Sequence, residues 1–166
     1  MNRIWICWTH STGKTTLLNN LNYKNTIQEI AREVIQILWV PQDMNKKERE
    51  LFQRLIFTKQ VSKEIELEDF ITDRTLFDVL AYSMDLPCYK QLLLQAIKHL
   101  KTRPYTHVFY IPIEFTLESD WVRHTCEKYR SLIDKRILKL LNELSIPYYT
   151  ITWSVDERIE KIKALI

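Results

Sequence analysis

The residues from Trp8 to Thr16 combine one glycine with a lysine and two threonines, in a spacing that suits phosphate binding. They read Trp8-Thr9-His10-Ser11-Thr12-Gly13-Lys14-Thr15-Thr16. A loop of this length can turn its backbone N–H groups toward a phosphate at the start of a helix. Lys14 would then reach the β- and γ-phosphates, and Thr15 would place its hydroxyl on Mg²⁺. We expect the whole segment to bind a nucleotide, with Lys14 in a catalytic role.

This segment matches the P-loop pattern G-x-x-x-x-G-K-[ST] except at its first glycine, where Trp8 stands. Gly13 keeps the position at which the backbone must approach the phosphates closely. The alternative is a chance helix start that Ser11 or Thr12 caps. The apolar run over 3–7 and the amphipathic stretch after Lys14 favour the phosphate-binding interpretation, since the pattern requires a strand before it and a helix after it.

A carboxylate and a guanidinium follow a second apolar run, at Asp73 and Arg74. Ligands of open α/β sheets bind beyond the carboxyl ends of the strands. Asp73 there could hold Mg²⁺ through water or accept the proton of an acceptor hydroxyl, and Arg74 could clamp an anionic group. The alternative is that Asp73 caps a helix while Arg74 is solvated. Asp78 is expected to be structural or peripheral.

Two further sets of charged residues are candidates for the same site. Glu29 and Arg32 lie three residues apart and could line the acceptor pocket, or form a surface ion pair. Arg123 and Arg130 belong to a lid-like segment over about 116–130, where cations would neutralise charge on a transferring phosphoryl group. The alternative for this segment is a solvated basic helix start.

Short apolar runs alternate with helical patterns, which is typical of an α/β fold with a mostly parallel sheet. We expect five strands, at 3–7, 26–29, 70–73, 107–111 and 148–152. We expect helices at 13–22, 31–38, 46–66, 76–84, 89–101, 127–144 and 154–165. Ser154 and Glu157 form a capping-box pattern for the last helix. No linker or repeat divides the chain, so one domain over 1–166 is expected.

Composition excludes several classes of protein. The chain has 166 residues, 46% of them hydrophobic, with a net charge of +3, which is typical of a globular protein and not of a disordered one. Its basic residues are scattered, so no nucleic-acid partner is expected. Three cysteines without metal-binding spacing indicate a reducing, cytoplasmic location. No apolar run is long enough for a membrane span.

These motifs, in this order, resemble the NadR-like P-loop kinase/ATPase domain family, which includes nicotinamide ribonucleoside kinases and is related to nucleoside and nucleotide kinases. The resemblance is carried by the following features: the T-H-S-T-G-K-T-T loop, Glu29-x-x-Arg32, Asp73-Arg74 with Asp78 and Tyr82, Arg123, and the terminal S-V-D-E-R-I. It implies a three-layer P-loop NTPase fold with a five-stranded parallel sheet of strand order 2-3-1-4-5. It also implies that Arg123 acts from a lid and that segment 152–158 lies near the adenine.

The function that we expect from these motifs is an ATP- and Mg²⁺-dependent phosphotransferase. GTP is the second donor considered, and the acceptor is a small nucleoside- or nucleotide-like molecule, bound by Glu29, Arg32 and Arg74. Asp73 and Arg123 are catalytic candidates together with Lys14. Thr15 and Asp73 are the candidate metal ligands, and Arg130 is a candidate nucleotide contact. The alternative is a nucleotide-binding regulatory module with little turnover. The sequence does not decide whether the protein forms a homodimer.

Tryptophan stands where the family pattern has glycine. The chain has one glycine, where average usage near 7% would give about 12, and five tryptophans. Trp8, Trp121 and Trp153 occupy glycine positions of the family pattern, and Trp39 lies at a helix end where glycine is the usual stop. We hypothesise that the source organism reads the UGA codon as glycine. Translation of the gene with a code that reads UGA as tryptophan would then place tryptophan at these positions. The alternative is a diverged family member with genuine tryptophans.

Overall fold

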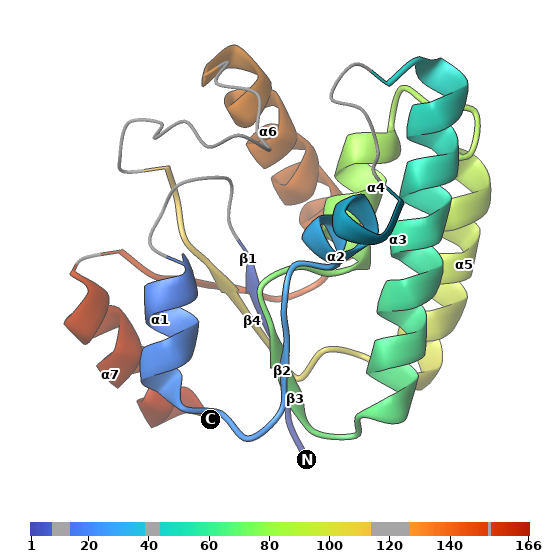
Figure 1. Cartoon of the computed structure of the whole chain (residues 1–166). Coiled ribbons are helices and arrows are strands. Elements are labelled where there is room, and N and C mark those ends of the chain that lie inside the picture. Colours follow the sequence, from blue (N-terminus) through green and yellow to red (C-terminus); the bar gives the residue numbers. More distant parts are fainter. Residues whose placement is uncertain (8–13, 39–43, 114–126, 153) are drawn as a thin grey trace.

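Five strands pair in parallel into one sheet. They are β1 (Arg3–Cys7), β2 (Thr26–Ile27), β3 (Phe70–Thr72), β4 (His107–Tyr110) and β5 (Tyr149–Thr150). Their order is β2-β3-β1-β4-β5, with β1 in the centre (Figure 1). The structure, a computed structural model, describes residues 1–7, 14–38, 44–113, 127–152 and 154–166. The predicted fold class and strand order are confirmed.

Helices cover both faces of the sheet. They are α1 (Lys14–Leu21), α2 (Ile30–Leu38), α3 (Lys46–Glu66), α4 (Leu76–Ser83), α5 (Tyr89–Thr102), α6 (Glu127–Glu143) and α7 (Val155–Leu165). Helices α1 and α7 pack on one face, and α2 to α6 pack on the other (Figure 1). The predicted capping box at Ser154 is present, because Ser154 Oγ accepts from Glu157 N and the Glu157 carboxylate accepts from Ser154 N. Within the described ranges, no helix has the length and apolarity of a membrane span.

The central strand divides the core by simple alternation. Trp5 and Cys7 point toward α2–α6, while Ile4 and Ile6 point toward α1 and α7, and all four are fully buried. Trp5 stacks on Phe77 of α4 with ring centroids 5.1 Å apart. This packing fixes α4 against the sheet, and the residues just before α4 are therefore held at the carboxyl edge of the sheet.

Four strands are shorter than the sequence predicts, β3 and β4 by one residue each and the edge strands β2 and β5 by more. We expected 26–29 and 148–152, but β2 ends at Ile27 and β5 spans only Tyr149–Thr150. Both are edge strands with one neighbour each, so pairing stops where that neighbour stops. Ile27 pairs with Thr72, the last residue of β3, and the Glu29 carbonyl already accepts from Arg32 N in the first turn of α2. Glu29 therefore lies beyond its strand and not at its end.

Candidate nucleotide and acceptor site

The segment predicted to bind phosphate connects the central strand to the first helix. Strand β1 ends at Cys7 and α1 begins at Lys14, so the connection leaves the sheet at its carboxyl edge. Residues 8–13 of the predicted loop lie outside the described residues, as does Arg123. The backbone of Lys14, Thr15 and Thr16 forms the first turn of α1, and their side chains are not described.

Asp73 and Arg74 follow β3, which is the direct neighbour of β1. Thr72 pairs in register with Trp5, so the residue after it emerges at the same edge as the connection that follows β1. Asp73 is 8% exposed and Arg74 7% exposed. The structure therefore places this carboxylate and this guanidinium at the carboxyl edge of the sheet, next to the end of β1, as buried groups and not solvated ones.

The Arg74 guanidinium lies between two carboxylates. Its Nη1 donates to Asp78 Oδ1 at 2.8 Å, and its Nη2 is 3.5 Å from Glu29 Oε1. Glu29 also accepts from Arg32 Nε at 2.9 Å through its other oxygen. Burial by itself disfavours the charged guanidinium, but the Glu29 and Asp78 carboxylates outweigh it and raise the pKa of Arg74 above its ordinary value. Glu29, Arg32 and Arg74 are thus brought together, and the i,i+3 ion pair is part of that cluster.

The first turn of α4 holds this cluster in place. Thr75 is its N-cap and accepts from Phe77 N at 3.2 Å, so the alternative in which Asp73 caps the helix is wrong. Asp78 Oδ2 accepts from Thr75 N at 2.8 Å, which completes a capping box. Asp78 was expected to be structural or peripheral, and it is structural, because the same carboxylate also accepts from Arg74 Nη1. The i,i+4 spacing of Arg74 and Asp78 was a usable signal.

Helix α6 joins the site through an aromatic contact. The rings of Tyr82 in α4 and Tyr129 in α6 have centroids 6.1 Å apart. Burial raises the pKa of Tyr82, although Arg74 opposes the shift, so its hydroxyl stays protonated. Arg130, the next residue of α6, is 1% exposed, and its Nη1 is 3.6 Å from Glu127 Oε1. The predicted nucleotide contact Arg130 therefore lies on the helix that packs against α4.

Of the two predicted metal ligands, the structure describes the side chain of Asp73 only, and its chemistry fits a nucleotide-bound Mg²⁺. Asp73 is a nearly buried carboxylate at the edge where β1 ends, and α1 begins directly after the connecting loop. A phosphate-bound Mg²⁺ commonly takes one protein carboxylate, often through water, and one hydroxyl at the start of such a helix. Asp73 and Thr15 are the residues that would supply them.

Comparison with known proteins identifies the fold. A family model described as "AAA domain" matches residues 3–158. No curated protein matches the chain. A NadR protein in complex with NR superposes with a TM-score of 0.74 and 18% identity, over 99% of this chain and 50% of that chain. This chain thus spans about half the length of that NadR chain.

Two kinases of similar size to this chain have the same fold. Deoxyadenosine kinase from M. mycoides, solved with dCMP and dCDP, superposes with a TM-score of 0.66 and 18% identity, over 98% of this chain and 96% of that chain. Thymidylate kinase from Candida albicans superposes with a TM-score of 0.65 and 13% identity, over 98% of this chain and 89% of that chain. These likenesses confirm the predicted P-loop kinase fold and the resemblance to NadR-like kinases.

Proposed function

Since the chain belongs to the AAA-domain family that the model of residues 3–158 describes, we propose that it transfers the γ-phosphoryl group of ATP to a hydroxyl of a small nucleoside-like acceptor. One observation supports this proposal most. A cluster of the buried Asp73, Arg74 and Asp78 with the half-buried Glu29 lies at the carboxyl edge of the sheet, beside the end of β1. That is where ligands of open α/β sheets bind.

Each candidate residue is given a role in this reaction. Lys14 and Thr15 are proposed to bind the phosphates and the metal, and Mg²⁺ when bound neutralises charge on the phosphates. Asp73 is the proposed base for the acceptor hydroxyl, or the carboxylate that contacts Mg²⁺ through water. Arg123 and Arg130 are proposed to neutralise charge on the transferring group. The location proposed for this reaction is the cytoplasm.

The charges of the described residues favour an acceptor without a phosphate group. Arg32 and Arg74 already contact the carboxylates of Glu29 and Asp78, and Asp73 adds a third carboxylate. An acceptor phosphate placed here would face more carboxylates than guanidinium groups, and like charges in a poorly hydrated site repel strongly. A nucleoside offers hydroxyl groups that can donate to these carboxylates. We therefore propose a nucleoside acceptor in preference to a nucleoside monophosphate.

An ADP-release assay tests the proposed activity. The chain is incubated with ATP and Mg²⁺, or with GTP and Mg²⁺ where GDP release is read instead, together with nucleosides that include nicotinamide riboside and with the matching monophosphates. The expected result is ADP release that depends on a nucleoside and that falls at least a hundredfold in Asp73→Asn, because general base and charge contributions are of about that size. ADP release that is independent of any acceptor would contradict the proposal, as would a preference for monophosphates.

A second function, nucleotide binding with little turnover, is favoured by Trp8. If that position needs a glycine conformation, a tryptophan costs about 1–2 kcal/mol, which corresponds to roughly tenfold weaker nucleotide binding. The variant Trp8→Gly is therefore assayed beside the chain as written. A nucleotide-dependent rise in melting temperature without ADP production in both proteins would select the binding module. Acceptor-dependent ADP release in Trp8→Gly alone would show that Trp8 suppresses the kinase.

A further inference from the structure

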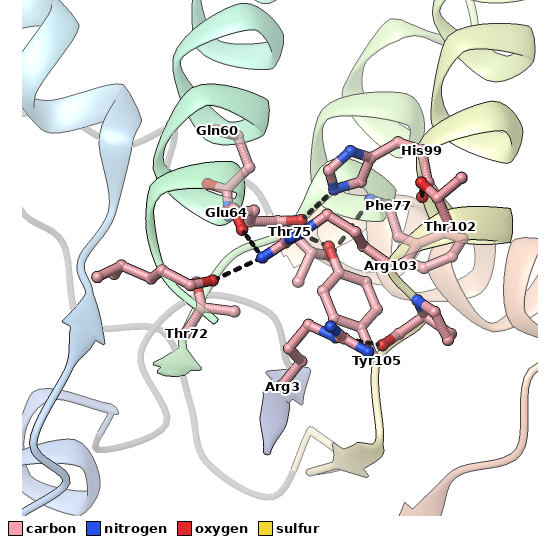
Figure 2. A network of polar contacts seen from close by, with 12 residues as sticks. Arg3, Gln60, Glu64, Thr72, Thr75, Phe77, His99, Thr102, Arg103 and Tyr105 are labelled. Carbon is pink, nitrogen blue, oxygen red and sulfur yellow. Dashed lines mark hydrogen bonds and ion pairs between the residues drawn. The ribbon is translucent and has the colours of Figure 1, made fainter. Parts of the chain in front are cut away.

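A buried polar network lies behind the site, between α3, α5 and the segment before β4 (Figure 2). At its centre Glu64 is 1% exposed. Its carboxylate accepts from Gln60 Nε2 at 2.7 Å and from Tyr105 Oη at 2.8 Å, and it lies 3.0 Å from His99 Nε2. Arg103 Nη2 donates to the main-chain oxygens of Glu64 and Leu67 at 2.9 Å each. These contacts fix the end of α3 from several directions.

Gln60 connects this network to the site. It is 1% exposed, and its Nε2 donates both to Glu64 Oε1 and to the main-chain oxygen of Arg74, at 3.0 Å. Both partners are acceptors, so only one orientation of the amide satisfies them. The same Arg74 oxygen accepts from Thr72 Oγ1, which in turn accepts from Arg74 N at 3.3 Å. The backbone of Arg74 is thus held on both sides while its side chain reaches Glu29 and Asp78.

We propose that Gln60 is a positioning residue for the acceptor site, acting through Arg74, and that Glu64 orients it. Glu64 fixes the amide of Gln60, the amide fixes the Arg74 carbonyl, and the guanidinium is thereby aimed between Glu29 and Asp78. Burial and the adjacent Glu64 carboxylate raise the pKa of Tyr105, so its hydroxyl remains a donor that holds Glu64 in place. A purely structural role for Gln60 would be limited to joining α3 to the segment before α4, without an effect on acceptor binding.

The kinetic test of this role rests on the proposed function. Gln60→Met keeps the length of the side chain and removes the donor to Arg74, and Gln53→Met, two turns earlier in the same helix, is the matched control. A small displacement of a substrate-binding group commonly costs about a hundredfold in rate. We expect kcat/KM for the acceptor to fall about ten- to a hundredfold in Gln60→Met, with KM for ATP within about twofold.

Gln53→Met should leave both kinetic parameters unchanged. The proposal would be overturned if kcat/KM fell equally for the acceptor and for ATP in Gln60→Met. It would also be overturned if a folded Gln60→Met protein kept the wild-type kcat/KM for the acceptor. If Gln60→Met does not fold, Gln60→Leu takes its place, because it also fills the buried site with an apolar side chain that has no donor. The same split between acceptor and ATP is expected from it.

A spectroscopic readout separates this inference from the proposed function. In ¹⁵N-labelled protein the guanidinium N–H signal of Arg74 is assigned with the variant Arg74→Lys. We expect Gln60→Met to shift this signal and to speed its exchange with water, while Gln53→Met leaves it unchanged. If the wild-type chain phosphorylates no acceptor, the proposed function fails but this measurement still decides the positioning role. An Arg74 signal that is identical in wild type and Gln60→Met would refute it.

Discussion

The surroundings of a charged pair decide how much it contributes to stability. Arg74–Asp78 and Arg54–Glu50 have the same four-residue spacing and similar distances, 2.8 and 2.9 Å. The side chains of the first pair are 9% and 5% exposed, whereas those of the second are 38% and 23% exposed. Water screens the second pair, while removing one partner of the first leaves a buried charge.

Asp78→Asn should therefore lower the free energy of unfolding by about 2–4 kcal/mol, because it breaks a buried pair and weakens a helix cap. Glu50→Gln should cost less than about 0.5 kcal/mol. Urea denaturation of both variants measures the difference. Losses of equal size would show that burial does not distinguish the two pairs.

The tryptophans differ in their physical roles. Trp5 is fully buried in β1 and stacks on Phe77, as a genuine core residue does. Trp8, Trp39, Trp121 and Trp153 lie outside the described residues, and their sequence contexts are those of glycine. We predict UGA codons at these four positions and UGG at position 5. Sequencing of the coding DNA checks this, and UGG at all five positions would refute the decoding hypothesis.

At the scale of elements, the end of α6 carries a conformation that suits glycine. Ser145 has φ 53°, and Ile146 N donates to Leu141 O at 2.9 Å, as in a Schellman motif. The left-handed conformation is unfavourable for a residue with a Cβ. We expect Ser145→Gly to raise the free energy of unfolding by about 0.5–1 kcal/mol, after the entropy that glycine adds to the unfolded chain is subtracted.

Asn22, which follows α1, is the matched control for Ser145. It has the same φ of 53°, but asparagine tolerates this conformation well. Asn22→Gly should therefore change the free energy of unfolding by less than Ser145→Gly does. A larger gain at Asn22, measured by the same denaturation experiment, would mean that φ alone does not explain the effect.

The contact between β4 and α6 makes stability depend on pH. Tyr110 Oη donates to Asp134 Oδ2 at 2.9 Å, and burial raises the pKa of Asp134 although Tyr110 and Arg130 oppose the shift. A carboxyl group whose pKa is raised on folding stabilises the protein at low pH, and that stabilisation is lost as the group ionises. We expect Asp134→Asn to gain in melting temperature over wild type as pH rises from about 4 toward neutrality. A difference that stays constant with pH would contradict this.

At the scale of the whole molecule, local signals predict more of the fold than of the contacts. The apolar run Ile4-Trp5-Ile6-Cys7 predicts a strand, and the capping box at Ser154 predicts the start of α7; both are confirmed. The ends of β2 and β5 depend on how far their single neighbours extend, which no local pattern encodes. Gln60 reaches Arg74 because α3 packs against α4 and the sheet. Such a contact depends on tertiary packing. The sequence therefore indicated Arg74 as a candidate site residue, but it did not indicate Gln60, which holds the Arg74 carbonyl.

The single-domain prediction depends on the coupling of two cores through one sheet. Ile4 and Ile6 pack toward α1 and α7, while Trp5 and Cys7 of the same strand pack toward α2–α6. A substitution that destabilises the core on one face of the sheet should therefore lower the stability of the core on the other face as well. Ile162→Ala in α7, a fully buried position, should cost about 2–5 kcal/mol.

The measurement that checks this coupling is hydrogen exchange in urea, read separately for α7 and for α4. In a cooperative domain the amides of both helices lose protection at the same urea concentration, and Ile162→Ala lowers that concentration equally for both. Leu94→Ala, at a site 70% exposed on α5, serves as the control and should leave both midpoints unchanged. If α7 opened first in Ile162→Ala while α4 kept the wild-type midpoint, the two faces would be separate folding units. The site at the edge of β1 would then lie between two units that open independently.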